Sequence, residues 1–358
     1  MKKDTQLNIA SSVLAVICGL LFGTLVLLFA NPDQALRGLS IILMGGFADG
    51  MSGVGAMLYI ATPIIMTGLS VGFAFKTGLF NIGASGQFTV GAFVAVYIGV
   101  KWTFIPPSIH WIVALIGAAI GGALWGMIPG VLKAFRNVNE VIASIMANYI
   151  GMYLVNYMIK GNIYDQLRSQ SQEVAPSAII PKAGLDKLFN SSNLNIGPII
   201  AAVFVIIVFI LIEKTVFGYE LKACGMNRDA SRYAGINERK SIILSMSISG
   251  ALAGVGGALL YLAGSGRYLQ VLDVLAAEGF TGISVALLGL SNPIGILFSG
   301  IFIGHIYVGG TNLQLLNFVP EIIDIIISSI IYCGAFSLLL KHFIGNTLKW
   351  NKKRGERD

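Results

Sequence analysis

Polar side chains able to hydrogen-bond a neutral solute lie at the start of an apolar stretch over residues 79–100. Asn81 and Ser85 are four residues apart, so they would share one face of a helix, and Gln87 follows two residues later. The glycines between them allow another backbone to approach closely. Packing accounts for the glycines, whereas the buried amides require a hydrogen-bonding partner or a solute. This stretch therefore predicts neutral hydrogen-bonding chemistry.

A second polar face occurs over residues 141–159. On a helical wheel, Asn148, Tyr149 and Asn156 occupy one arc, and small residues such as Ala147 and Gly151 occupy the opposite arc. The small residues form a seam for helix packing. Because an amide is costly to bury in lipid, the polar arc should meet protein or water. Two interpretations stay open, namely hydrogen bonds between helices and the lining of a solute pathway.

The sequence contains no recognisable constellation of reactive side chains. Its three histidines are widely scattered and its three cysteines are too few for a disulfide framework, so we expect no metal site. Glu278, Glu321 and Asp324 lie near the ends of apolar stretches, where an interface position, or contact with a solute or an external protein, would account for them. A Gly-Lys dipeptide, which a phosphate-binding loop requires, does not occur. We therefore expect no enzymatic activity and no cofactor, and any ATP must be bound by a separate subunit.

The composition predicts the elements that hold these residues. Of the 358 residues, 55% are hydrophobic and 11% are charged, against roughly 25% charged in a soluble domain. The 44 glycines fit a bundle in which small residues let helices approach in lipid. The apolar run at 9–30 is too long for a signal peptide, so it should remain as a first span. The predicted fold class is an all-α polytopic membrane helix bundle, forming a single domain over residues 1–358.

About ten stretches are long and apolar enough to cross a membrane as helices. The predicted spans are 9–30, 56–75, 79–100, 111–132, 141–159, 197–212, 241–263, 272–291, 293–312 and 321–341. The eighth contains Glu278, and a short or re-entrant element bounded by the Asn292-Pro293 turn is the alternative there. Residues 31–55 are Gly-rich and amphipathic and should lie at the membrane surface.

The distribution of charge orients the bundle. Most of the 24 Lys and Arg residues fall on the side of the bundle that holds both termini. They lie near the N-terminus, at span ends on that side, in the loop 213–240 and in the C-terminal tail. By the positive-inside rule this side, with both termini, faces the cytoplasm. The polar loop 160–196 then faces outward. Because the basic residues follow this rule, the net charge of +7 indicates a lipid environment and no nucleic-acid partner.

The cytoplasmic loop 213–240 holds a short helical candidate from Asn227 to Tyr233. Asn227 can cap this helix, and Asp229 lies in its first turn, where the helix dipole favours an anion. A helix of this length is unstable alone and needs a partner surface. The alternative is a solvated loop that only orients the protein.

Four motifs resemble those of one transporter superfamily. The segment GYELKACGMNRDASRYAGIN (218–237) looks like the cytoplasmic coupling loop of ABC permeases of the branched-chain amino acid, ribose and nucleoside superfamily. The segments GLFNIGASGQF (78–88), VNEVIASIMANYI (138–150) and GFTGISVALLGLSNPIGI (279–296) fit the same group, in the same order. The chain most resembles the longer permease of nucleoside systems that use a basic-membrane-protein type binding lipoprotein.

This resemblance implies a permease of the bacterial cytoplasmic membrane that imports a nucleoside from an external binding lipoprotein. A separate cytoplasmic ABC ATPase would hydrolyse ATP, and a second permease subunit would complete a heterodimer. The residues implied in ATPase coupling are Gly225, Asn227, Arg228, Asp229, Arg232 and Gly235. The residues proposed for the solute pathway are Asn81, Ser85, Gln87, Asn148, Tyr149 and Asn156.

Two positions depart from the nucleoside pattern and keep other solutes open. Nucleoside permeases usually carry Glu where this chain has Ser85, and relatives often have an acid in place of Thr281. A sugar such as ribose would suit the polar faces almost equally well, whereas a branched-chain amino acid would need partners for both charged ends. An ion-coupled secondary transporter is less favoured, because the acids other than Glu278 lie at span ends or in loops.

Overall fold

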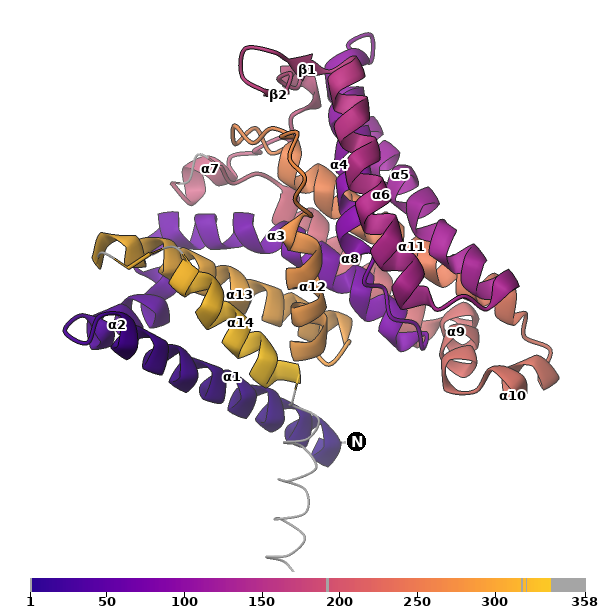
Figure 1. Cartoon of the computed structure of the whole chain (residues 1–358), viewed down its shortest axis with the longest axis horizontal. Coiled ribbons are helices and arrows are strands. Elements are labelled where there is room, and N and C mark those ends of the chain that lie inside the picture. Colours follow the sequence, from indigo (N-terminus) through magenta and orange to yellow (C-terminus); the bar gives the residue numbers. More distant parts are fainter. Residues whose placement is uncertain (1, 191–192, 317, 320, 336–358) are drawn as a thin grey trace, which may run out of the picture.

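The computed structural model describes residues 2–190, 193–316, 318–319 and 321–335, and most of them are helical (Figure 1). One helix falls in each predicted span: α1 (Lys2–Ala30), α3 (Gly50–Lys76), α4 (Ala84–Lys101), α5 (Pro107–Arg136), α6 (Glu140–Asn162), α8 (Gly197–Lys214), α11 (Glu238–Tyr261), α12 (Ala277–Leu288), α13 (Pro293–Leu313) and α14 (Glu321–Ala335). Among the described residues, seven helices are long and apolar enough to cross a membrane. The helical membrane bundle is therefore confirmed, while the count of about ten spans stays a prediction. Residues 336–341 of the last predicted span, and the basic tail after them, lie outside the described residues.

Shorter elements join these helices. They are α2 (Ala35–Met44), α7 (Leu185–Leu188), α9 (Val216–Met226), α10 (Arg228–Tyr233) and the strands β1 (Tyr164–Asp165) and β2 (Gln170–Ser171), with 3-10 turns at Gly45–Phe47, Pro176–Ala178 and Gln314–Leu316. The two strands pair antiparallel as a small hairpin inside the predicted external loop.

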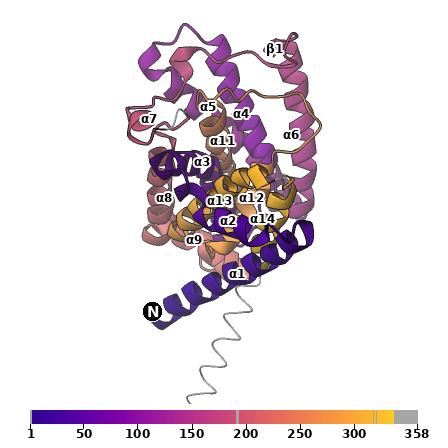
Figure 2. The ribbon, with the colours of Figure 1, turned by 90° about the vertical axis from the view of Figure 1, so that its left-hand side faces the viewer.

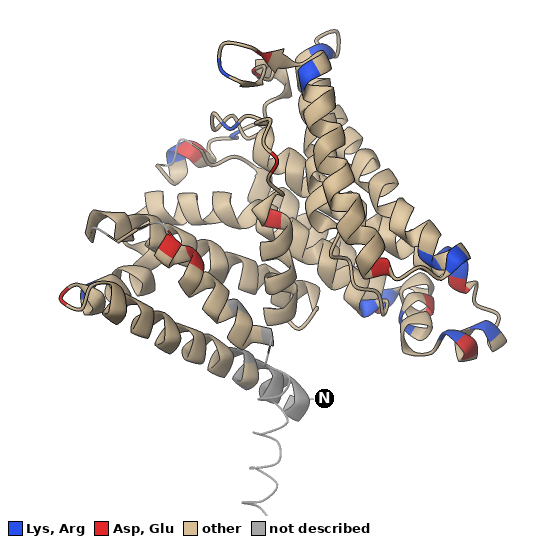
Figure 3. Cartoon of the chain, viewed as in Figure 1, with Lys and Arg blue, Asp and Glu red and all other residues tan. Residues whose placement is uncertain are grey.

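The bundle has two polar ends. The hairpin end carries β1, β2 and α7, and the coupling end carries α9 and α10 (Figure 1). Side-chain contacts fix which helix termini lie at each end, since His110 near the start of α5 hydrogen-bonds Ser177 of the predicted external loop at 2.8 Å. Gly78, just after α3, packs against Gly225 at the end of α9. Charged residues lie mostly at these two ends, with others beside α2 and further acids on α12 and α14 (Figure 3).

The centre of the bundle is formed by α3 and α11. Their apolar stretches are 78% and 72% buried, against 28% for α5 and for α8. Helix α3 packs against α8, α11, α12 and α13, and α11 packs against α4 and α5. At the edge of the bundle, α1 lies along α14, with Gly19 against Ile330 (Figures 1 and 2). The remaining faces of α1 and α5 are rich in exposed apolar side chains, as expected for helices that face lipid.

Glycines bring α11 and α5 into backbone contact. A Cβ at Gly250 would overlap the carbonyl of Gly122 and would lie 3.1 Å from the Cα of Gly126. The backbone of Gly254 likewise packs against Ala118 and Gly122. Small residues at these positions allow helices to approach closely in lipid, where packing rather than water exclusion drives association.

We expect the substitution Gly250→Leu to separate α11 from α5 and to reduce the amount of folded permease severely. A leucine side chain cannot be accommodated without moving a helix backbone, and overpacking typically costs about 1–3 kcal/mol or more. The measurement is the yield of monodisperse protein extracted from membranes. Gly161→Leu is the matched control, since a Cβ there meets no atom within 4 Å. Equal yields from the two variants would contradict this packing.

The structure corrects the eighth predicted span. Residues 272–291 do not form one helix, because α12 covers only Ala277–Leu288 and residues 262–276 run without regular helix before it. Twelve residues rise about 18 Å, which is less than the roughly 30 Å of a bilayer core. The alternative of a short element is therefore the one observed. Irregular backbone at this depth must be buried in protein or line a cavity.

Candidate solute cavity and coupling surface

A buried network of amide side chains joins α3, α4 and α11 at the turn between α3 and α4. Asn81 Nδ2 donates to Gln87 Oε1 at 2.7 Å, and Gln87 Nε2 donates back to Asn81 Oδ1 at 3.0 Å. Asn81 Nδ2 also donates to Ser249 Oγ at 2.6 Å, and Asn81 Oδ1 accepts the Gly83 N–H at 3.1 Å. Both amide side chains are almost completely buried. Their hydrogen bonds are therefore satisfied inside the protein.

Asn148 bonds to the backbone around the same turn, whereas Ser85 bonds to the residue before α12. Asn148 Oδ1 accepts the Gly86 N–H at 2.8 Å, and Asn148 Nδ2 donates to the Ile82 carbonyl at 3.0 Å. Ser85 Oγ donates to the Ala276 carbonyl at 2.9 Å, which ties α4 to the start of α12. Hydrogen bonding within the protein accounts for these side chains as they stand. Their part in solute passage stays a prediction.

Position 85 also faces α12 directly. A Cβ at Gly279 would lie 2.5 Å from the Ser85 nitrogen, so the two backbones are in contact. The larger glutamate that the resemblance leads us to expect at this position would have to fit beside this contact. Ser85, which replaces the glutamate of the nucleoside pattern, therefore lies where α4 packs closely on α12.

The remaining two predicted pathway residues, Tyr149 and Asn156, lie in different surroundings on α6. Tyr149 is 47% exposed on the outer surface of the helix. Asn156 instead lies beside the irregular segment 262–276, where its Nδ2 donates to the Leu272 carbonyl at 3.0 Å and to Asp273 Oδ1 at 3.2 Å. Asn156 therefore holds one wall of a cavity, which the other five predicted residues do not line.

This outer cavity has a volume of about 450 Å³ and lies between α6, α4, the end of α11 and the segment 262–276. Its volume falls in the range of roughly 300–1,000 Å³ usual for small-molecule sites. The lining residues combine amides, tyrosines and apolar side chains: Thr89, Met152, Val155, Asn156, Ile159, Gln170, Tyr261, Gly266, Arg267, Tyr268, Leu269, Gln270, Leu272, Val274 and Ala276.

The β1–β2 hairpin anchors the far wall of the outer cavity. Ser171 N–H donates to the Leu269 carbonyl at 2.8 Å, and Leu269 N–H donates to Ser171 Oγ at 3.1 Å. Gln170 and Gln270 form a further antiparallel bridge. The sequence did not predict this wall, because residues 272–276 were included in the predicted span 272–291. A cluster of Arg, Tyr and Gln at 267–270 between two apolar runs was the available signal.

At the coupling end, the predicted capped helix is confirmed. Helix α10 covers Arg228–Tyr233, and the Ala230 N–H donates to Asn227 Oδ1 at 3.0 Å. Asp229 lies in its first turn, as expected from the helix dipole. Gly235 follows with φ of +83°, a backbone conformation that glycine adopts readily.

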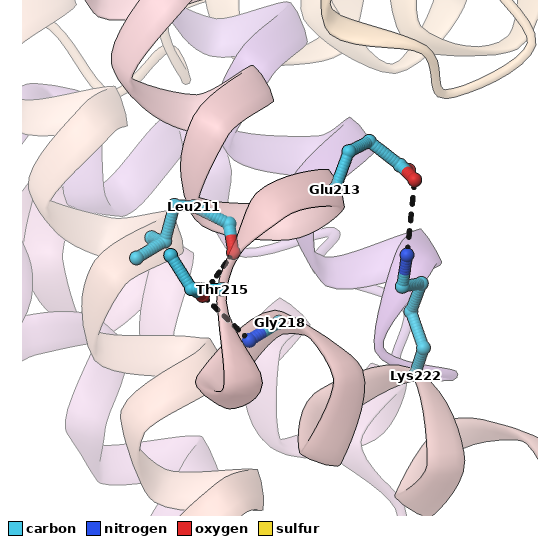
Figure 4. A network of polar contacts seen from close by, with 5 residues as sticks. All are labelled: Leu211, Glu213, Thr215, Gly218 and Lys222. Atoms are coloured by element: carbon cyan, nitrogen blue, oxygen red, sulfur yellow. Dashed lines mark hydrogen bonds and ion pairs between the residues drawn. The ribbon is translucent and has the colours of Figure 1, made fainter.

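A second helix, which the sequence analysis did not predict, fixes α10 to the bundle. Thr215 Oγ1 accepts the Gly218 N–H at 3.0 Å at the start of α9 and donates to the Leu211 carbonyl at 2.6 Å (Figure 4). Glu213 pairs with Lys222 at 3.0 Å across the same bend. The backbone of Gly218 packs on the end of α8 and leaves no room for a side chain.

The six predicted coupling residues do not all face outward. A Cβ at Gly225 would lie 2.7 Å from the Gly78 nitrogen, so Gly225 packs on the turn after α3. Arg228 is half-buried, whereas Gly225, Asn227, Asp229, Arg232 and Gly235 are exposed. Two large apolar side chains join the exposed set, namely Met226 at 87% and Tyr233 at 95% exposure. We call the exposed side chains of Met226, Asp229, Arg232 and Tyr233 the coupling surface.

Comparison with known proteins shows the family. Residues 53–335 match the family described as "Branched-chain amino acid transport system / permease component". The chain belongs to this permease family. It is 39% identical over 338 residues to the guanosine ABC transporter permease protein NupP of Bacillus subtilis, covering 94% of this chain and 96% of the relative. It is 33% identical over 360 residues to the nucleoside ABC transporter permease protein NupB of Lactococcus lactis, covering 96% of this chain and 97% of the relative.

A more distant relative transports a different kind of solute by its name. The glucose ABC transporter permease protein TsgB13 of Haloferax volcanii is 27% identical over 327 residues, covering 89% of this chain and 84% of that protein. Membership in the permease family and the apolar helices make this chain a multi-pass membrane permease.

Proposed function

We propose that the chain is the transmembrane subunit of an ABC importer for nucleosides. The observation that carries the proposal is similarity along nearly the full length to two permeases named for guanosine and for nucleosides. The described lining of the outer cavity fits such a solute, since amides, hydroxyls and aromatic rings outnumber charges there. The chain would transport the solute while a separate ATPase hydrolyses ATP.

The proposed partners follow from the two ends of the bundle. A cytoplasmic ABC ATPase would bind the coupling surface, and an external binding lipoprotein would deliver solute at the hairpin end. A second permease is supported by the relatives, because two permeases named for the same solute occur in each organism. The chain is 39% and 25% identical to NupP and NupQ of Bacillus subtilis, and 33% and 30% identical to NupB and NupC of Lactococcus lactis.

The proposed topology has about ten crossings of the bacterial cytoplasmic membrane, with both termini and the loop 213–240 in the cytoplasm. The eighth crossing is made by the irregular segment 262–276 together with α12. Residues 1 and 336–358 at the termini lie outside the described residues, so side-specific labelling within the bundle is the sharper test. Single cysteines at Leu167, 98% exposed in the hairpin, and at exposed Asn227 provide the two probes. Ser171 would be a poor external probe because it is 2% exposed.

In a variant whose three native cysteines are serines, a membrane-impermeant maleimide should label Leu167→Cys in intact cells. It should label Asn227→Cys only after the cells are opened. A permeant maleimide applied to both variants serves as the control for reactivity. Labelling of both cysteines from the same side would refute the topology.

The solute is tested by uptake of labelled guanosine, adenosine, ribose and leucine in cells with and without the gene. Loss of nucleoside uptake alone is expected. Re-expression of the chain should restore it. Loss of ribose or leucine uptake, with nucleoside uptake intact, would show that the solute is a sugar or a branched-chain amino acid instead.

A further inference from the structure

We infer that the outer cavity is a solute-binding site of the permease itself, and that it takes a flat, uncharged heterocycle bearing hydroxyls. The inference rests on the proposed function and assigns that function to a site. Its residues come from α4, α6, the end of α11, the hairpin and the segment 262–276, which are far apart in the sequence.

The position of the outer cavity suits a solute that enters from the hairpin end. The cavity runs from Gln170 in β2 to Ala276, where α12 begins. At its inner limit, the Ala276 carbonyl accepts the Ser85 hydroxyl, and Ser85 is completely buried. Beyond that point, the buried pair of Asn81 and Gln87 is hydrogen-bonded to Ser70 of α3 and Ser249 of α11. The cavity is thus closed toward the coupling end.

The chemistry of the wall favours rings over ions. Tyr261 and Tyr268 supply aromatic surface, on which a planar base can stack. Met152, Val155 and Ile159 on α6 form an apolar side. Gln170, Gln270 and Thr89 supply amide and hydroxyl groups that can pair with the edge of a base or with sugar hydroxyls.

One ionised side chain lines the described part of the outer cavity. Arg267 is the single ionised residue among the described lining residues, and its Nη1 lies 3.9 Å from Glu278 Oε1. The lining itself offers no carboxylate to the ammonium group of a zwitterionic amino acid, and the two nearby carboxylates already have partners, Glu278 beside Arg267 and Asp273 on Asn156. A neutral solute avoids that desolvation cost.

Asn156 has a positioning role in this arrangement. Its amide nitrogen is committed to Leu272 and Asp273, so it holds the segment 262–276 against α6. The hairpin holds the same segment from the other side through Ser171 and Leu269. The spacing between Tyr268 and α6 is therefore fixed by hydrogen bonds within the protein, without a bound solute.

The experiment is ligand protection of a single cysteine. In the serine background, Gln270→Cys is labelled by a methanethiosulfonate reagent in membranes containing the whole transporter, over a titration of guanosine. Guanosine should slow the labelling, while leucine should not. Leu167→Cys, which is exposed outside the outer cavity, is the matched control and should label at one rate throughout.

The aromatic contact is tested in the same assay. Adding Tyr268→Ala should raise the guanosine concentration needed for half protection by about tenfold or more, in line with base stacking on an aromatic ring. Adding Tyr268→Phe, which keeps the ring, should leave it within about twofold. Protection by ribose as strong as by guanosine, or equal effects of the two substitutions, would overturn the assignment to a heterocycle.

The outcomes separate this inference from the proposed function. Guanosine uptake by the wild-type transporter without protection of Gln270→Cys would overturn the cavity assignment and leave the nucleoside importer standing. Absence of any nucleoside uptake would overturn the proposed function itself. Protection that also occurs at Leu167→Cys would show a general conformational effect and would likewise overturn the cavity assignment.

Discussion

A permease carrying Ala230→Pro should enter the membrane in normal amounts and transport no solute. Helix α10 has only six residues, and its first turn depends on the bond from the Ala230 N–H to Asn227 Oδ1. Proline has no N–H to donate, and it disfavours helical backbone at the preceding residue, Asp229. A helix this short has little else to hold it, so the coupling surface should lose its shape.

Two measurements check this expectation. Solute uptake by cells should fall to the background of the gene deletion, and the ATPase should no longer co-purify with the permease. Ala230→Ser is the matched control, since it keeps the N–H at an exposed position and should retain most of the uptake. Near-normal uptake by the proline variant would rule out coupling through α10.

The substitution Asn81→Leu should abolish the folded permease rather than alter its choice of solute. Leucine would leave the Gln87 amide oxygen, the Gln87 amide nitrogen and the Gly83 N–H without the partner that Asn81 provides in a buried place, whereas the Ser249 hydroxyl would keep its bond to the Ser70 carbonyl. An unsatisfied buried polar group costs about 1–3 kcal/mol. Three such groups approach the whole stability of a typical domain, about 5–15 kcal/mol.

The amount of permease in the membrane and the midpoint of its thermal unfolding test this second expectation. Asn162→Leu is the matched control, because the exposed Asn162 amide donates only to the Met158 carbonyl of its own helix. A variant Asn81→Leu that folds normally but accepts different solutes would instead place Asn81 in the solute pathway.

Local patterns in the sequence predicted the helices and their ends well. The apolar stretches predict the helices of the bundle, and the predicted helix cap at Asn227 is confirmed by its bond from the Ala230 N–H. Both signals are local, because hydropathy and capping depend on residues close together along the chain. Gly83 and Gly86 likewise signalled a close approach of another backbone, although not their partners Ser144 and Asn148 on α6.

The candidate site depended on contacts that no local pattern contains. A helical wheel groups Tyr149 with Asn156, but only Asn156 contacts the segment 262–276. Its partner Leu272 is 116 residues further along the sequence. The wheel also cannot show that Asn148 is committed to Ile82 and Gly86. Glu278 lies beside Arg267 because α12 begins only at Ala277. The irregular segment 262–276 comes before it, and hydropathy assigned part of that segment to a span.

The most direct test of nucleoside import is transport by the purified transporter in lipid vesicles. The chain would be reconstituted together with an ABC ATPase and the proposed second permease, with the proposed binding lipoprotein and labelled guanosine on the side of the hairpin. We predict that guanosine crosses to the other side only when ATP is supplied on the side of α10, and that Ala230→Pro vesicles show no ATP-dependent transport. Guanosine transport that proceeds equally without ATP, or ATP-driven transport of leucine or ribose but not of guanosine, would contradict the account.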